Sequence, residues 1–149
     1  MTNDEHYPGT YDGLVRLVER LRGPEGCPWD LEQTHESLIS EFLEECYELV
    51  EAIELGDPEK VLEELGDVLF HVVFQVQLGA EAGSFDQGRG LRSLVDKLVR
   101  RHPHVFGDVE ASDSSEVKAN WEAIKQEERS DLDTSILRGV PRQMPALPY

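Results

Sequence analysis

The chain has 149 residues, 39% of them hydrophobic and 30% charged, which is the composition of an ordinary globular protein of one domain. Its 31 Asp and Glu residues outnumber its 14 Lys and Arg residues, and the formal net charge of −17 makes a polymeric nucleic acid a poor partner, because the surface repels phosphates. No apolar run approaches the length of a bilayer span, so we expect no membrane partner.

Residues 1–10 are polar and are expected to form a flexible N-terminus without an export or transit signal. The two cysteines have no C-x-x-C spacing, and together these features predict a cytoplasmic protein. Between Tyr11 and Arg22 apolar residues recur every three or four positions, which predicts an amphipathic helix. Residues 23–33 are rich in turn formers, and we expect Trp29 in this loop to pack onto a helix.

The next segment, from Thr34 to Leu55, carries the strongest helical pattern, with one apolar stripe that ends before a Gly-Asp-Pro turn. Asp57 is expected to cap the following helix, and Pro58 to be its first residue. This helix should run to about Ala82. Because it is apolar on nearly every side, we expect it to be buried.

Two more helices are predicted, from about Leu91 to Arg101 and from about Ser115 to Arg129. No segment alternates polar and apolar residues as a half-buried strand does, so the predicted fold is all-α, a bundle of about five helices. We expect residues 11–130 to form one domain. Residues 131–149 contain three prolines and are expected to be an extended tail.

Carboxylates gather on both helices around the Gly-Asp-Pro turn. One sector of the first helix carries Glu41, Glu44, Glu45, Glu48 and Glu51. Such a charged sector is usually a solvated face, although neighbouring like charges cost stability. On the second helix Glu64, Asp67 and His71 form a narrow polar strip between apolar residues, and we expect this strip to be buried.

A short turn makes the two helices antiparallel, so that Glu45 and Glu48 can face Glu64 and Asp67. Buried carboxylates need a cation, and only Lys60 lies near the strip. Oxygen ligands of this kind suit Mg²⁺ or Mn²⁺. A solvated acidic face and a di-iron site stay open as alternatives, although di-iron bundles use Glu-x-x-His pairs, which this hairpin lacks.

The string EECYE at residues 44–48, followed by ELGD at 64–67, resembles the E-E-x-x-E and E-x-x-D signature of the MazG-type nucleoside triphosphate pyrophosphohydrolases, a family of the all-α NTP pyrophosphatase superfamily. Three further blocks resemble the same family. They are GCPWDLEQT at 26–34, DKLVRRHPHVF at 96–106 and NWEAIKQEE at 120–128.

The resemblance implies an enzyme that assembles as a homodimer or homotetramer. It implies hydrolysis of nucleoside or deoxynucleoside triphosphates to the monophosphate and pyrophosphate with Mg²⁺, or Mn²⁺ as a substitute, in control of the nucleotide pool. Glu44 is implied as the base that activates water or as a further metal ligand. The implied metal ligands are Glu45, Glu48, Glu64 and Asp67, and the implied substrate contacts are Lys97, Arg101, Trp121 and Lys125.

Several alternatives stay open. The substrate could be narrow, such as dUTP, a damaged nucleotide or a phosphoribosyl-ATP, and a helical interaction module without chemistry would use the acidic sector to bind a basic partner. Lys97 and Arg101 could instead be solvated, and Trp121 could be a core residue. The sequence does not decide whether three histidines are structural or belong to the site. They are His71, His102 and His104.

Overall fold

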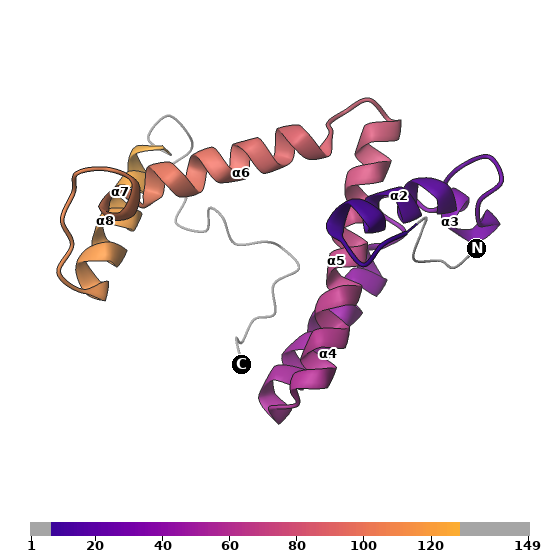
Figure 1. Cartoon of the computed structure of the whole chain (residues 1–149), viewed down its shortest axis with the longest axis horizontal. Coiled ribbons are helices and arrows are strands. Elements are labelled where there is room, and N and C mark those ends of the chain that lie inside the picture. Colours follow the sequence, from indigo (N-terminus) through magenta and orange to yellow (C-terminus); the bar gives the residue numbers. More distant parts are fainter. Residues whose placement is uncertain (1–6, 129–149) are drawn as a thin grey trace. The chain divides into compact units, whose positions relative to one another are not determined.

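The computed structural model describes residues 7–128, in which every regular element is a helix (Figure 1). The all-α prediction is therefore confirmed. The chain divides into two compact units, one up to Arg92 and one from Ser93 onward. The helices are α2 (Tyr11–Leu21), α3 (Pro28–Glu32), α4 (Ile39–Leu55), α5 (Pro58–Glu81), α6 (Gln87–Arg101), α7 (Pro103–Phe106) and α8 (Ser114–Glu127).

Helices α4 and α5 form the predicted antiparallel hairpin and lie side by side (Figure 1). The turn between them is tight because Gly56 has a φ of 68°, in the left-handed region that glycine adopts without strain. The side chain of Asp57 then accepts hydrogen bonds from the backbone N–H groups of Glu59 and Lys60, with Pro58 as the first helical residue. Both predictions for this turn are confirmed.

Helix α4 begins later than the sequence predicts. The expected start at Thr34 is wrong, because the residues before Ile39 form turns. The N–H of Thr34 donates to Ser37 Oγ at 3.0 Å, and the N–H of Ser37 donates to Thr34 Oγ1 at 3.1 Å. Local side-chain bonds of this kind compete with helical ones, so the helix starts only after the buried Leu38.

The core of the first unit lies where α2 crosses α5. Its centre is Phe74, which is 1% exposed and packs edge to face against Phe70, with ring centroids 5.7 Å apart. The other members of the buried cluster are Val18, Leu38, Val73 and Leu78, with Tyr11, Leu14 and Val15 packed against them. This core holds α5 in place, and α5 carries half of the acidic hairpin.

An arginine and a histidine attach the loop between α2 and α4 to α5, the histidine being His35, whose Nδ1 lies 2.5 Å from Gln75 Oε1. The Arg22 guanidinium pairs with Glu81, with Nη2 2.7 Å from Oε2, and donates through Nη1 to the carbonyl oxygens of Asp30 and Gln33. The expectation that Trp29 packs onto a helix is wrong, because its side chain is 54% exposed on α3. The polar residue beside it, Asp30, is the buried one.

Helix α5 is not apolar and buried on every side, as the sequence suggested. Large apolar side chains at helical spacing remain exposed along both arms of the hairpin. We call this set the exposed apolar face. It consists of Ile39, Leu43, Tyr47, Val50 and Ile53 on α4, and of Leu62, Leu65, Leu69 and Val72 on α5.

The second unit holds most of α6, and α7 and α8. Helix α6 starts at Gln87, four positions before the expected Leu91, and α8 is capped by Asp113, whose side chain accepts from two backbone N–H groups. Most of the predicted flexible N-terminus and all of the predicted tail lie outside the described residues, so the domain boundaries stay a prediction. No helix within residues 7–128 is long and apolar enough to cross a membrane.

Candidate functional site

Three carboxylates converge in the middle of the α4–α5 hairpin. One oxygen each of Glu45, Glu48 and Glu64 lies within 4.8 Å of the other two. Glu45 and Glu48 are three residues apart and therefore share a face of α4, while Glu64 meets them from α5. Glu64 is 2% exposed, Glu45 is half-buried and Glu48 is exposed. The structure thus brings three of the four predicted metal ligands together.

Asp67, the fourth predicted ligand, lies one turn after Glu64 on α5 but outside this close group. Its side chain is exposed, so the expectation of a fully buried strip is wrong at this position. Its charge still acts on the group, because it helps to raise the pKa of Glu45. Glu44, the predicted base, is exposed on α4 and acts on Glu45 in the same way.

The carboxylates of this group repel one another. Burial is the largest cause that raises the pKa of Glu45 above its usual range, and the neighbouring negative charges raise it further. Those charges belong to Asp67, Glu48, Glu64 and Glu44. A divalent cation between the oxygens would reverse this repulsion, because it is a larger charge than any side chain nearby.

Lys60 already supplies one positive charge. Its Nζ lies 2.5 Å from Glu64 Oε1 and 3.7 Å from Glu63 Oε2. The hydrogen bond to Glu64 raises the pKa of the Lys60 ammonium. Lys60, the one cation that the sequence places near the strip, is thus paired with Glu64. One ammonium still faces several carboxylates, and the lysine side chain is 46% exposed on a flexible stem, so it can move away.

The donor set fits a hard divalent cation. All ligand atoms of the group are carboxylate oxygens, which Mg²⁺ and Mn²⁺ prefer, and neither histidine nor cysteine joins it. Zinc and di-iron sites would draw on such residues, so the donor chemistry argues against both. Among residues 7–128 this is the one group of three or more such ligands at these distances.

His71 belongs to the packing beside the group. It is 7% exposed, with its ring 6.0 Å from that of Phe42 and edge to face with Phe70 at 5.7 Å. Burial lowers the pKa of His71, and the charges of Glu41 and Asp67 oppose that shift only in part. Its buried Nδ1 has no hydrogen-bond partner within the described part of the chain. These surroundings favour a neutral, structural histidine.

The predicted substrate contacts all lie in the second unit, and Arg101 already has protein partners. Its guanidinium carbon lies 5.3 Å from the centroid of the Trp121 ring. The same guanidinium pairs with Glu128, which also pairs with Arg100. Sequence reasoning missed both Arg100 and Glu128, although each stands in a block that resembles the family.

The two predicted lysine contacts differ from each other. Lys125 Nζ lies 3.1 Å from Glu122 Oε1 on the same turn of α8, so it too has an internal carboxylate partner. Lys97 is half-buried on α6 and makes no hydrogen bond or ion pair within residues 7–128. Among the predicted cations, Lys97 is therefore the one whose charge is least compensated by residues 7–128.

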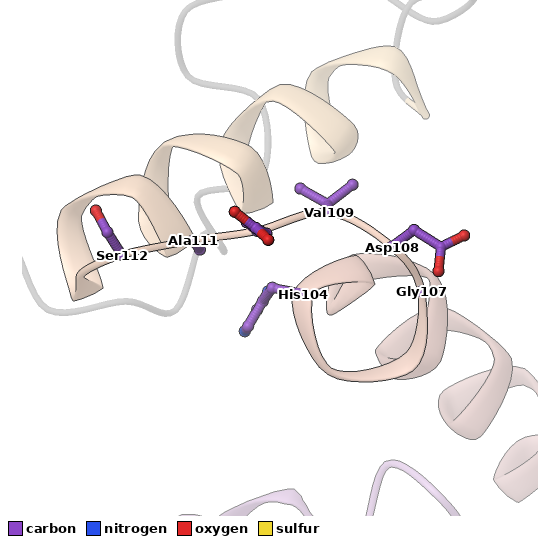
Figure 2. A pocket seen from close by; sticks show the side chains of 7 residues that line it. His104, Gly107, Asp108, Val109, Ala111 and Ser112 are labelled. Atoms are coloured by element: carbon purple, nitrogen blue, oxygen red, sulfur yellow. The ribbon is translucent and has the colours of Figure 1, made fainter.

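His102 and His104 lie near Trp121. The Nδ1–H of His102 donates to the Leu98 carbonyl at 2.6 Å, and its ring meets Trp121 edge to face at 4.9 Å. His104 lines an open pocket with the loop of residues 107–112 (Figure 2). That loop carries two carboxylates, from Asp108 and Glu110, which repel phosphate. The pocket therefore does not favour His104 as a phosphate contact, and His102 packs as a structural residue.

Comparisons with known proteins point to one family. Residues 33–106 match the family model of the MazG nucleotide pyrophosphohydrolase domain. The nucleoside triphosphate pyrophosphohydrolase of Escherichia coli (strain K12) is 49% identical over 138 residues, which are 91% of this chain and 52% of that protein. A protein of Thermotoga maritima named nucleoside triphosphate pyrophosphohydrolase/pyrophosphatase MazG is 45% identical over 137 residues, 92% of this chain and 52% of that one.

A solved structure agrees. The crystal structure of a mazG-related protein from Thermotoga maritima superposes with a TM-score of 0.66 at 25% identity, covering 77% of this chain and 98% of that one. The uncharacterized protein YabN of Bacillus subtilis is 48% identical over 88% of this chain, and the match covers 27% of YabN. The chain thus spans about half or less of the length of these curated relatives. By its sequence blocks, its helical fold and these matches, the chain belongs to the MazG family.

Proposed function

We propose that this chain hydrolyses nucleoside and deoxynucleoside triphosphates to the monophosphate and pyrophosphate, with Mg²⁺ as its metal and Mn²⁺ as a substitute. The observation that carries the proposal is the convergence of Glu45, Glu48 and Glu64 within 4.8 Å. The names of the Escherichia coli and Thermotoga maritima relatives support the reaction. A cytoplasmic location and a role in control of the nucleotide pool stay predictions from the sequence.

The three glutamates, with Asp67 beside them, would hold the cation. When bound, a divalent cation neutralises the triphosphate and lowers the pKa of a water molecule. Lys60 would leave Glu64, since its ammonium and the cation compete for the same oxygen. An acidic protein can then bind an anionic substrate, because the charge of the cation would lie between the carboxylate oxygens of the protein and the phosphate oxygens of the substrate.

In the proposed reaction, a water oxygen attacks the α-phosphorus and the bond from that phosphorus to the α–β bridging oxygen breaks. Glu44 accepts the proton of the attacking water, and pyrophosphate leaves with the bridging oxygen. We propose Lys97, Arg101 and Lys125 as contacts for the phosphates. We propose Trp121 as the contact for the base, although its packing against Arg101 and His102 also suits a structural residue.

A panel of NTPs and dNTPs incubated with the protein and Mg²⁺ tests the reaction. We expect nucleoside monophosphate and pyrophosphate, separated by ion-exchange chromatography. Nucleoside diphosphate with inorganic phosphate as the only products would overturn the proposal. Glu48→Gln should abolish turnover, whereas the matched control Glu51→Gln, one turn further along α4 and outside the close group, should retain it.

The same panel separates a broad activity from a narrow one. If the substrate is dUTP, a damaged nucleotide or a phosphoribosyl-ATP, its kcat/KM will exceed those of the common triphosphates by a large factor. A helical interaction module without chemistry makes a different prediction. In that case Mg²⁺ would not raise the melting temperature, because a protein without a metal site gains no stability from metal.

We further propose that a second copy of the chain covers the exposed apolar face, giving a homodimer or a tetramer of two such pairs. The exposed side chains recur at three- and four-residue intervals along both helices of the hairpin, for example Leu62, Leu65 and Leu69. Nine large apolar side chains left exposed at helical spacing are unusual for a monomer and typical of an interface between subunits.

A further inference from the structure

In the second unit two arginines share one carboxylate. Arg100 and Arg101 end helix α6, and Glu128 follows the last turn of α8. Arg100 lies against one oxygen of Glu128, with Nε 2.7 Å and Nη2 2.5 Å from Oε1. Arg101 lies against the other oxygen, with Nε 3.0 Å from Oε2 and Nη2 also bonded to it. Each carboxylate oxygen is thus held by the edge of one guanidinium group.

This convergence needs an anion. Consecutive residues of a helix project about 100° apart, so neighbouring arginine side chains diverge unless a shared ligand draws them together. Two guanidinium groups face the one carboxylate of Glu128 at this point. Phosphate groups pair with guanidinium edges in the same fork geometry as a carboxylate does, and they carry more charge.

One arginine of the pair is held in position by packing, and the other is more exposed. The side chain of Arg101 is 14% exposed and lies against the Trp121 ring, so its guanidinium has little freedom to turn away. Arg100 is 55% exposed and can follow a ligand. Glu128 stays ionised at neutral pH, since the two guanidinium groups lower its pKa to about 2. Protonation therefore does not open the contact, and displacement requires another anion.

We infer that Glu128 acts as a built-in competitor, which occupies the Arg100–Arg101 pair until a phosphate group of a polyphosphate compound displaces it. The inference rests on the proposed function for the identity of that compound, a nucleoside triphosphate or its pyrophosphate product. It adds Arg100 to the predicted phosphate contacts. In this role Glu128 competes with phosphate for the two guanidinium groups and so lowers the affinity of the pair for phosphate compounds.

Binding of inorganic tripolyphosphate to the whole protein without metal, measured by isothermal titration calorimetry, tests this inference. Glu128→Gln removes the competing charge and should raise the affinity about fivefold, the factor expected for loss of ion pairs at a partly exposed site. Glu51→Gln removes the same charge on α4, outside the second unit, and should leave the affinity unchanged. Adding Arg100→Gln to Glu128→Gln should cancel the gain.

An unchanged affinity in Glu128→Gln would overturn the inference, even if the variant melts at a lower temperature, because lower stability alone is what a purely structural ion pair predicts. If Glu128→Gln does not fold, the Nε–H resonances of the two arginines in the wild-type protein decide instead. Both should shift during a tripolyphosphate titration, and a titration that moves neither contradicts the inference.

The two proposals can fail separately. If Glu128→Gln binds tripolyphosphate no more tightly than the wild type, while the wild type still releases pyrophosphate, only the role of Glu128 is refuted. A gain in tripolyphosphate affinity in a protein that hydrolyses no nucleotide supports the role of Glu128 and refutes the proposed reaction. In an active protein, Glu128→Gln should lower KM with little change in kcat.

Discussion

The ion pair between Arg22 and Glu81 gives a prediction whose size follows from the structure. Arg22 Nε lies 2.9 Å from Glu81 Oε1 and Nη2 lies 2.7 Å from Oε2, and the guanidinium carbon lies 5.2 Å from the centroid of the Phe74 ring. The Arg22 side chain is 7% exposed and that of Glu81 is 37% exposed. Glu81→Gln keeps the size of the side chain and leaves the buried guanidinium without its countercharge.

The expected cost is about 2 kcal/mol, between the ~3–5 kcal/mol for breaking a buried pair and the ~0–1 kcal/mol of an exposed one. The cost falls below the buried range, because Glu81 is partly solvated and the glutamine oxygen can still accept one hydrogen bond. For a chain of this length, each kcal/mol shifts the melting temperature by about 2–4 °C. Glu81→Gln should therefore melt about 4–8 °C below the wild-type protein.

Differential scanning calorimetry at pH 7 measures this difference. Glu25→Gln is the matched control, because Glu25 pairs with Arg20 at 3.4 Å with both side chains largely exposed. Such a pair contributes about 0.3 kcal/mol or less, so the melting temperature should change by about 1 °C or less. If Glu81→Gln melts within the range of this control, the pair does not hold the loop of residues 23–33 to α5.

The same pair predicts a dependence on pH. The hydrogen bond from Arg22 is the largest cause that lowers the pKa of Glu81 below its ordinary value of 4.5. A carboxylate whose folded pKa is lowered contributes its full stability above the unfolded pKa and loses it as the pH falls through the folded pKa. The difference in free energy of unfolding between the wild type and Glu81→Gln should therefore be at its maximum at pH 7 and should shrink below a pH of about 4.5.

Four further predictions concern the hairpin. Lys60→Gln removes the ammonium that competes for Glu64, so Mg²⁺ should raise the melting temperature more in this variant than in the wild type, and an equal rise would contradict the competition. Glu48→Gln should lose the stabilisation by Mg²⁺ in the same thermal assay, and a full response would argue against Glu48 as a ligand. Leu65→Glu should make the protein monomeric in analytical ultracentrifugation, and a wild-type monomer would refute the proposed assembly. Asp57→Ala removes the cap of α5 and should cost about 1 kcal/mol in urea unfolding, whereas an unchanged midpoint would show that the cap is dispensable.

The features that the sequence predicts well are local. Apolar periodicity and turn residues act over a few positions, which is why the hairpin, its glycine turn and its Asp57 cap agree with the structure. The convergence of Glu45, Glu48 and Glu64 follows from the same local pattern, because a short turn fixes which faces of two helices meet. The contact of Lys60 with Glu64 was also readable from its four-residue spacing.

The features that the sequence does not predict depend on distant partners. Arg22 and Glu81 are 59 positions apart, and Arg101 and Glu128 are 27 apart, so no local pattern connects them. The exposure of Asp67 has a similar reason. A helical wheel shows that it shares a strip with Glu64, but only the packed neighbours decide how much of each side chain they cover.

The turn at Gly56 has a consequence for how this hairpin can change. Glu48 and Glu64 lie equally far along the chain from Gly56, and so do Glu45 and Asp67. One extra residue inside α5, between Pro58 and Glu64, would rotate Glu64 by about 100° around the helix axis and carry it away from its partners. A single insertion in either arm, between the turn and its carboxylates, therefore separates the facing oxygens, whereas substitutions in the turn that keep the glycine at position 56 leave their register unchanged.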